Sequence, residues 1–277
     1  MSVTTGTKTE SGLGETIRVV IHALLIALVI RTFLFQPFNI PSGSMKATLL
    51  IGDYLFVSKY SYGYSHYSFP LSPPIFSGRV WASEPNRGDV VVFRLPKDDT
   101  TDYIKRVIGL PGDIIRMNNG TLIINGEPVK RERETPRMIP IDINSPCGSE
   151  HDPALTDFRV QGADGKGYCK VPIVRETLPS GRTYETVELG RSAEDNFGPV
   201  RIPAGHVWLM GDNRDDSADS RVPEWQGGLG GPVPWENIGG RAEFITFSLD
   251  GSTVWWNPLT WPEAFRSGRA GRSLRNS

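Results

Sequence analysis

The sequence lacks an excess of charge of either sign, because Lys and Arg together number 30 and Asp and Glu together number 31. Such a chain has no basic field that would concentrate a polyanion, so we expect no nucleic-acid partner. A composition that favours helices is also missing, since the chain contains 30 glycines and 22 prolines. This disfavours a helical bundle and favours a β-rich domain with many turns.

Cysteine is scarce: only Cys147 and Cys169 occur, 22 positions apart in a polar, loop-like stretch. No further ligands accompany them at the spacing of a zinc site. If this stretch lies outside the cytoplasm, we expect the pair to form a disulfide. Two unrelated thiols are the alternative, because connectivity cannot be deduced from sequence alone. Closing a loop of this length would stabilise the fold by about 3 kcal/mol.

Histidine, a frequent catalytic base, is rare as well. His22 lies in an apolar run, His66 and His151 lie in polar stretches, and only His206 precedes a predicted core strand. A Ser-His-Asp site that uses His206 and Asp212 is an alternative, but neither residue occurs in a triad signature. We interpret His206 as structural.

One long apolar stretch is present near the N-terminus, from Ile17 to Phe35, with an uncharged run from Val19 to Ile30. Arg18 and Arg31 at its ends can extend toward opposite headgroup layers. A cleavable signal peptide is the alternative, but the residues after this run lack a small-x-small cleavage site. We therefore predict an uncleaved membrane anchor whose orientation the flanking charges do not determine. An interfacial aromatic belt is predicted at Phe33, Phe35 and Phe38.

Beyond the anchor, β-branched and aromatic runs alternate with turn signals. Strands are predicted at Asp53–Lys59, Val90–Arg94, Tyr103–Ile108, Arg201–Met210 and Arg241–Ser248. A tight hairpin turn is predicted at Asn119–Gly120, between two further apolar runs. Residues 128–200 are charged, rich in Gly and Pro and weak in strand signals, so we interpret them as an insertion on the main sheet.

The run Pro41–Met45 places a serine beside a glycine close to the anchor, with Ser44 nine positions after Phe35. An extended tether of this length reaches about 30 Å, so Ser44 acts near the membrane surface. Gly43 lets the backbone expose a hydroxyl and lets main-chain N–H groups approach a substrate carbonyl. A plain loop is the alternative, because this signal is weak alone.

A serine nucleophile needs a base, and Tyr103–Ile108 offers one. The strand period puts Lys105 on one face and Arg106 on the other. Guanidinium is not deprotonated in proteins, whereas an apolar setting can lower the pKa of lysine by several units. A lysine that reaches solvent from a strand is the alternative.

Five motifs together resemble those of bacterial type I signal peptidase (leader peptidase), a family of Ser/Lys-dyad serine proteases, and occur in the same order. They are Ser42–Met45 leading to Thr48-Leu49, Gly52-Asp53, Arg87–Phe93, Tyr103–Asp113 and Gly211–Arg221.

The resemblance implies that Ser44 attacks the scissile carbonyl and that Lys105 is the general base. It also implies an oxyanion hole formed by the Ser42 hydroxyl and the Ser44 backbone N–H.

Three further residues of the last motif have implied supporting roles. Ser217 would hydrogen-bond and orient Lys105, while Asp219 and Arg221 would form an ion pair. The sequence departs from the family at Ala47, where proline is usual, and at Asp216, where asparagine is common. Neither change removes a group that moves a proton, so we expect activity.

No cofactor is expected. A calcium site in the acidic loop is the alternative, but its carboxylates miss the one-three-five spacing and the closing Glu of such a site. The residues concerned are Asp212, Asp215, Asp216 and Asp219. We predict no metal.

By resemblance the fold is mainly β: a catalytic domain of coiled antiparallel sheet with a smaller inserted β region, on one N-terminal transmembrane helix. The predicted divisions are a disordered cytoplasmic tail (1–14), the anchor (15–36), the first part of the catalytic core (37–127), the inserted subdomain (128–200), the second part of the core (201–256) and a basic C-terminal tail (257–277). Disorder or contact with anionic lipid is expected for that last tail.

The implied reaction removes signal peptides from exported preproteins through an acyl-enzyme, at the outer (periplasmic) face of the bacterial inner membrane. Expected partners are the signal peptides and the lipid bilayer, and we expect a monomer. A substrate strand would place small residues at −1 and −3 in two apolar pockets. The first pocket is predicted from Ile40, Met45, Leu49 and Tyr103, and the second from Phe38, Leu55, Val92 and Ile104.

Other interpretations remain open. Within the same chemistry, the rivals are a self-cleaving repressor and a pilin-processing peptidase of a conjugation system. A repressor would carry a helix-turn-helix domain and no anchor, which is the reverse of this sequence. A non-catalytic membrane-anchored adaptor would be expected to have lost Ser44 or Lys105, and both are present.

Overall fold

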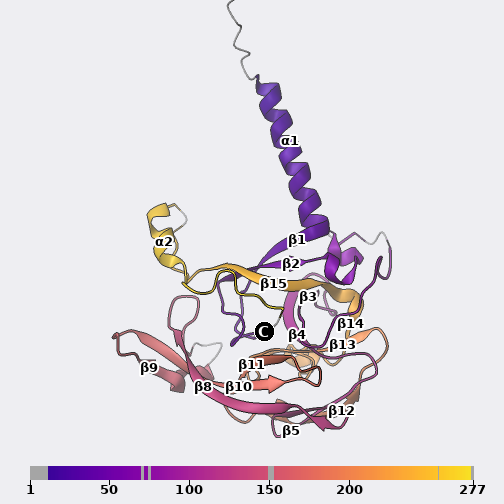
Figure 1. Cartoon of the computed structure of the whole chain (residues 1–277), viewed down its shortest axis with the longest axis vertical. Helices are drawn as coiled ribbons and strands as arrows, with labels where there is room; N and C mark the ends of the chain where they lie inside the picture. Colours follow the sequence, from indigo (N-terminus) through magenta and orange to yellow (C-terminus); the bar gives the residue numbers. More distant parts are fainter. Residues whose placement is uncertain (1–11, 70–71, 74–75, 149–152, 255, 276–277) are drawn as a thin grey trace, which may run out of the picture.

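A long helix at the N-terminus projects away from a body made of β-sheets (Figure 1). The computed structural model describes residues 12–69, 72–73, 76–148, 153–254 and 256–275. Most of the predicted tail 1–14 lies outside these residues. The predicted fold class, mainly β with one N-terminal apolar helix, is confirmed.

The projecting helix is α1 (Leu13–Val29), which continues into a short π-helix, η1 (Ile30–Leu34). The stretch Gly14–Leu34 is 21 residues long and apolar enough to cross a membrane. Only 6% of its most apolar 18 residues are buried in the fold. Apolar side chains exposed along a whole helix are expected where the surrounding medium is lipid. The next strand, β1 (Phe35–Asn39), begins directly after η1.

The main sheet has seven strands in the order β1-β2-β15-β3-β4-β13-β14, and its neighbouring strands are antiparallel. The further bounds are β2 (Asp53–Ser58), β3 (Val90–Arg94), β4 (Asp102–Gly109), β13 (His206–Met210), β14 (Val233–Pro234) and β15 (Ile238–Ser248). Strand β4 lies between β3 and β13, and its residues from Ile104 to Gly109 are buried on both faces. Lys105 and Arg106 are therefore enclosed by the fold.

Two smaller sheets pack beside the main sheet. One has the order β12-β5-β6-β7 and the other β11-β10-β8, with β9 also paired to β10. Their bounds are β5 (Ile114–Asn118), β6 (Thr121–Ile124), β7 (Glu127–Pro128), β8 (Lys130–Pro140), β9 (Arg159–Gln161), β10 (Gly167–Thr177), β11 (Thr183–Val187) and β12 (Phe197–Arg201). Although the insertion has weak strand signals, β8 and β10 are each 11 residues long.

The predicted hairpin turn at Asn119–Gly120 is confirmed, because it joins the antiparallel strands β5 and β6. Both residues have positive φ, 47° and 74°, as a two-residue turn of this hand requires. The remaining helices are short: η2 (Tyr60–Tyr62), η3 (His66–Ser68), η4 (Pro153–Phe158), η5 (Ala193–Asp195), η6 (Glu224–Gln226), η7 (Trp235–Asn237), η8 (Pro258–Thr260) and α2 (Trp261–Ala264).

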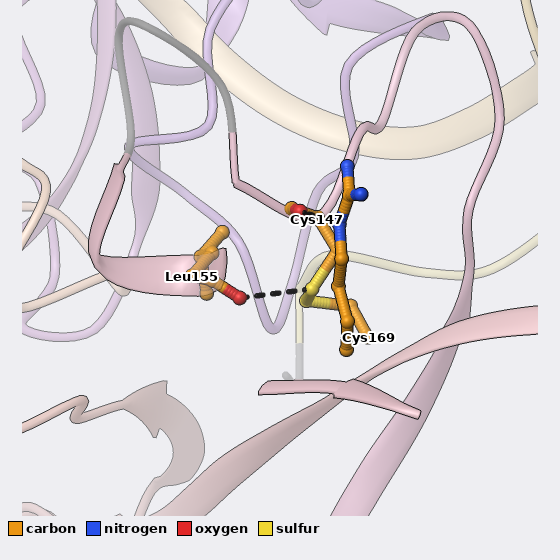
Figure 2. The surroundings of a disulfide bond; sticks show 4 residues. Cys147, Leu155 and Cys169 are labelled. Atoms are coloured by element: carbon orange, nitrogen blue, oxygen red, sulfur yellow. Dashed lines mark hydrogen bonds between the residues drawn. A yellow bond between two sulfur atoms is a disulfide. The ribbon is translucent and has the colours of Figure 1, made fainter. Parts of the chain in front are cut away.

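A disulfide joins Cys147 to Cys169 at the start of β10 (Figure 2). The Cys147 sulfur lies 3.1 Å from the carbonyl oxygen of Leu155, which closes the loop before β9. Both cysteines belong to a buried apolar cluster that also contains Ala47, three positions after Ser44. The disulfide-bonded insertion therefore packs directly against the turn that carries Ser44.

The C-terminal segment differs from the expected disordered or lipid-bound tail. After α2 the chain returns to the β-sheet body, where the label for its end lies (Figure 1). Arg266 pairs with Asp142, Arg269 with Asp53 and Arg275 with Glu243. Leu274 is fully buried. The arginines are ordered because carboxylates of the folded body compensate their charge, and two of these, Asp53 and Glu243, are buried. Sequence periodicity does not reveal such pairs.

Candidate active site

Ser44 and Lys105 come from distant parts of the chain and meet in the structure. Ser44 lies in the turn after β1, and Lys105 lies in the middle of β4. The Lys105 Nζ atom lies 2.6 Å from the Ser44 Oγ atom, within hydrogen-bond distance. Only 8% of Ser44 and 3% of Lys105 are exposed. A buried amine in contact with a hydroxyl is an arrangement suited to taking the proton of a serine nucleophile.

Burial changes the protonation of Lys105. Removal of the ammonium group from water disfavours its charged form and lowers the pKa of Lys105 from 10.5 to about 8. The carboxylates of Asp219, Asp216 and Asp212 oppose this shift, and Arg221 adds to it. At pH 7 roughly one such lysine in ten is neutral, against about one in three thousand for an ordinary lysine. Lys105 can therefore accept a proton near neutral pH.

Arg106 points to the opposite face of β4, as the strand period predicts. Its Nε and Nη2 atoms donate to the two carboxylate oxygens of Asp212, at 2.8 and 2.7 Å. Arg106 also donates to the carbonyl oxygen of Gly88 and to the Thr48 hydroxyl, and Thr48 in turn donates to Asp212. These charges are buried and paired, so Arg106 is a structural support and not a proton acceptor.

The alternative histidine site is not assembled. His206 Nδ1 lies 3.0 Å from the carbonyl oxygen of Ala204, at the start of β13. Asp212 follows the other end of β13 and pairs with Arg106. Within the described part of the chain, no histidine makes a hydrogen bond to Ser44, while His151 lies outside it.

The loop after β13 fixes the backbone of the Ser44 turn. The Asn213 backbone N–H donates to the Ser44 carbonyl oxygen at 3.0 Å, and its side-chain amide donates to the Gly43 carbonyl oxygen at 3.2 Å. Gly211 allows this close approach, since a Cβ atom there would lie 2.4 Å from the Ser44 carbonyl oxygen. A larger residue at this position would push the loop away from the turn.

Asp219 and Arg221 form a buried ion pair within the same loop. Arg221 Nε and Nη2 each donate to Asp219 at 2.9 Å, and the Gly211 backbone N–H donates to Asp219 at the same distance. Burial raises the pKa of Asp219, but the Arg221 charge and these hydrogen bonds outweigh it, so the pKa is lowered. The carboxylate stays ionised and holds the loop in one conformation.

A further acidic residue of this loop, Asp215, accepts hydrogen bonds from the backbone N–H groups of Leu189 and Gly190. It therefore ties the loop to the chain that follows β11.

Ser217 differs from the role implied by resemblance. Its Oγ atom is buried and has no hydrogen-bond partner among the described residues, so it makes no hydrogen bond to Lys105 here. The hydroxyl packs against Gly211, where a Cβ atom would lie 2.2 Å from it. An unpaired buried hydroxyl is costly, and this one lies in the loop that surrounds the Ser44 turn.

Of the two departures from the family pattern, Ala47 lies on the Ser44 turn and Asp216 lies in the loop after β13, beside that turn. Ala47 has a φ of +93°, which a proline ring cannot adopt because it fixes φ near −65°. The turn here thus differs from one that contains proline. A Cβ atom on Gly43 would lie 3.3 Å from Asp216 Oδ2 and 3.6 Å from Lys46 Nζ. Asp216 therefore places a carboxylate against the turn, on the side of Lys105.

A groove of about 320 Å³ leads to Ser44 and Lys105. Its walls include Tyr103 and Ile104 from β4, and Asp216 and Ala218 from the loop after β13. The other residues predicted to form pockets lie behind these walls in one apolar cluster, in which Phe38 is only partly buried: Ile40, Met45, Leu49, Leu55, Val92 and Phe38. Contact between a substrate and these residues stays a prediction.

Sequence reasoning missed three contacts with the Ser44 turn: those of Asn213, Thr48 and Arg269. Asn213 and Thr48 lie inside the recognised motifs, although spacing does not reveal what they bind. Arg269 donates to the Thr48 carbonyl oxygen from 221 positions away. No local pattern could have indicated that contact.

Comparisons with known proteins identify the family of this chain. A profile of the family described as "Signal peptidase, peptidase S26" matches residues 13–247. A signal peptidase I of Rickettsia typhi is 39% identical over 98% of this chain and 97% of its own length. That of Rickettsia canadensis is 36% identical over 100% and 99%.

A crystal structure of a signal peptidase I from Enterococcus faecalis is 21% identical and covers 57% of this chain and 97% of its own, with a TM-score of 0.29 that is too low to bear on the fold. The profile spans most of the chain, and the two Rickettsia relatives align with the chain over nearly their full length. The chain therefore belongs to the signal peptidase family, peptidase S26.

Proposed function

We propose that this protein is a membrane-bound endopeptidase that removes N-terminal signal peptides from exported preproteins, with Ser44 as nucleophile and Lys105 as general base. Membership of its family makes it a serine peptidase that cleaves signal peptides. The observation that carries the finer assignment is the distance of 2.6 Å between Lys105 Nζ and Ser44 Oγ in a buried site.

In the first half of the reaction, neutral Lys105 takes the proton of the Ser44 hydroxyl as its oxygen attacks the scissile carbonyl. The tetrahedral oxyanion accepts hydrogen bonds from the Ser44 backbone N–H and the Ser42 hydroxyl. Ser42 Oγ lies 3.5 Å from Ser44 Oγ, so it is close enough to reach this oxygen. Protonated Lys105 then donates to the leaving amine, and the acyl-enzyme forms on Ser44.

In the second half, a water molecule takes the place of the leaving peptide, and Lys105 removes its proton as it attacks the ester. The bond between the acyl carbon and the Ser44 oxygen then breaks, this oxygen takes the proton back from Lys105, and the carboxylate product leaves. The same amine thus serves both steps, because it returns to its neutral form each time. The proposed role of Ser217 is to orient Lys105, and its buried hydroxyl has no other hydrogen-bond partner among the described residues. The Asp219–Arg221 pair keeps the loop that carries Ser217 in place.

The groove supports the proposed preference for small residues at −1 and −3. Its walls are formed by residues of β4, by the Ser42–Ser44 turn and by Ala218 and Asp216, and they enclose only about 320 Å³ beside the nucleophile. Strand β3 pairs with β4 along residues 102–106, whereas β13 pairs with β4 only along residues 106–109. Among the described strands, the other edge of β4 at Tyr103–Lys105 therefore has no partner, and the substrate strand is proposed to lie along this edge, in the groove beside the turn.

We place the catalytic domain on the periplasmic side of the bacterial inner membrane, as a monomer. The apolar helix and the family indicate a membrane-anchored protein. The disulfide supports an oxidising compartment for the β-sheet body. We divide the body into a core in two parts, 37–127 and 201–256, and an insertion, 128–200. The main sheet supports this division because its strands lie within 35–109 and 206–248, although β12 at the end of the insertion pairs with β5 of the first part.

The test is to incubate the purified full chain with a preprotein and map the cut by mass spectrometry. Cleavage after a small residue at the signal-peptide junction is expected, and replacement of the −1 Ala by Leu should abolish it. Ser44→Ala and Lys105→Arg should both be inactive, since arginine keeps the charge but cannot accept a proton. His206→Ala is the matched control and should stay active. An active, folded Lys105→Arg enzyme would show that the base lies elsewhere.

A further inference from the structure

The C-terminal segment from Arg266 to Leu274 lies outside residues 13–247, the part that the family profile matches. It nevertheless returns to the sheet that carries the active site. The Ile245 backbone N–H donates to the Arg272 carbonyl oxygen at 3.0 Å, and the Leu274 N–H donates to the Glu243 carbonyl oxygen at 2.8 Å. These bonds align the segment along β15.

Arg269 is directed from this segment toward the loop that follows Ser44. Its Nε atom donates to Asp53 Oδ1 at 2.7 Å, and its Nη2 atom donates both to Asp53 Oδ2 and to the Thr48 carbonyl oxygen, the latter at 3.1 Å. Asp53 is fully buried and also accepts the backbone N–H of Leu50 at 2.8 Å. One guanidinium group therefore joins both ends of the loop 48–53.

Two other side chains of the segment support the same loop. Arg266 donates to the Ile51 carbonyl oxygen at 2.7 Å while its other nitrogens pair with Asp142 at 2.8 Å. Leu274 is fully buried in the apolar cluster that contains Met45 and Leu49. The C-terminal segment thus contacts the loop in two ways: its arginines bind backbone carbonyl oxygens of the loop, and Leu274 packs against the apolar side chains next to it.

Thr48 links this loop to the catalytic pair. Its backbone N–H donates to the Met45 carbonyl oxygen at 3.1 Å, within the turn that begins at Ser44. Its hydroxyl bonds to the Arg106–Asp212 pair, and Arg106 is the neighbour of Lys105 on β4. A shift of Thr48 would therefore move Ser44 relative to Lys105.

We propose that Arg269, supported by Arg266 and Leu274, is a positioning residue that sets the separation of Ser44 Oγ and Lys105 Nζ. This inference rests on the proposed function, because it takes those two atoms as the reacting pair. Small displacements in such pairs are expensive: about 1 Å of misplacement can lower a rate ~100-fold. Arg269 itself touches no reacting atom, so its effect must appear in kcat and not in substrate affinity.

The test measures kcat and KM of the full chain in detergent on a soluble signal-sequence peptide, with the melting temperature recorded in parallel. Arg269→Ala should lower kcat by about 100-fold with KM unchanged. Arg269→Lys retains a charge beside Asp53 but not the fork that also reaches Thr48, and it should lower kcat by about 10-fold while melting near the wild type. Arg275→Ala is the matched control, because Arg275 directly follows this segment and pairs with Glu243, a buried acid away from the loop.

The Lys variant decides the matter if Arg269→Ala does not fold. Wild-type kcat in Arg269→Lys, or an equal fall of kcat in Arg275→Ala, would overturn the proposal, as would a loss expressed as a higher KM. Ser44→Ala measured beside them separates the two ideas. If Ser44→Ala is inactive while both Arg269 variants keep wild-type kcat, only the positioning role fails, whereas an active Ser44→Ala removes the proposed function itself.

Discussion

Replacement of Lys105 by methionine should inactivate the protein and also make it harder to unfold at neutral pH. Burial lowers the pKa of Lys105 from 10.5 to about 8. A difference of about 2.5 pKa units corresponds to about 3 kcal/mol, which is the cost of keeping the ammonium charged inside the folded protein at pH 7. Methionine has a similar length and no charge, so it avoids this cost, although it also loses the contact with Ser44.

The pH dependence of stability separates the electrostatic effect of the Lys105 charge from the other effects of the substitution. Because the folded-state pKa lies below the unfolded-state pKa, unfolding takes up a proton between about pH 8 and pH 10.5. The stability of the wild type therefore rises with pH through this window, and the variant has no such change. From pH 7 to about pH 9.5, the free energy of unfolding of the wild type should therefore rise by about 2 kcal/mol relative to that of Lys105→Met.

Denaturant unfolding of the full chain in detergent, followed by tryptophan fluorescence at several pH values, measures this difference. Ser44→Ala is the control, since it keeps the lysine and should follow the pH slope of the wild type. A difference between wild type and Lys105→Met that does not change with pH would refute the reasoning, because it would mean that Lys105 has the same pKa folded and unfolded.

Three further predictions follow from the same geometry. On a soluble peptide, kcat/KM should rise with pH along a limb near pH 8, and Asp216→Asn should move that limb to lower pH, because the Asp216 carboxylate raises the pKa of Lys105; a limb that stays in place would contradict this electrostatic coupling. Deletion of residues 1–35 should spare cleavage of a soluble peptide but slow the processing of membrane-inserted preproteins, and equal loss on both substrates would instead assign the segment to folding. A double variant with serine at Cys147 and Cys169 should lose about 3 kcal/mol of unfolding free energy in denaturant titrations, and a midpoint equal to that of the oxidised wild type would argue against a stabilising cross-link.

Much of the main sheet could be predicted because its strands are short and bounded by strong turn signals. Val90–Arg94 matches β3, and Tyr103–Ile108 lies within β4. The opposite faces of Lys105 and Arg106 followed from the strand period alone, since buried strands alternate their side chains.

The remaining features depend on contacts that no local pattern encodes. In the sequence, Arg269 is one of several basic residues near the C-terminus. Only the structure shows that it pairs with Asp53, 216 positions earlier. Ser217 belongs to a recognised motif, yet the direction of its hydroxyl depends on a side-chain rotation that sequence does not determine. The register of the 11-residue strands of the insertion could not be predicted either, because their charged residues obscure the alternation of apolar and polar positions.

Strand β4 carries two different cations at adjacent positions, and this limits which insertions and deletions the strand can tolerate. Lys105 must face Ser44 while Arg106 faces Asp212. A single-codon insertion or deletion inside β4 would exchange the two faces, so that a guanidinium would meet the nucleophile and an amine would meet the carboxylate. Length variation in this strand should therefore be lethal to activity, whereas the exposed turn at residues 163–166, between β9 and β10, can lengthen freely because its backbone hydrogen bonds are local. A library of one-residue insertions scored for processing would map that contrast.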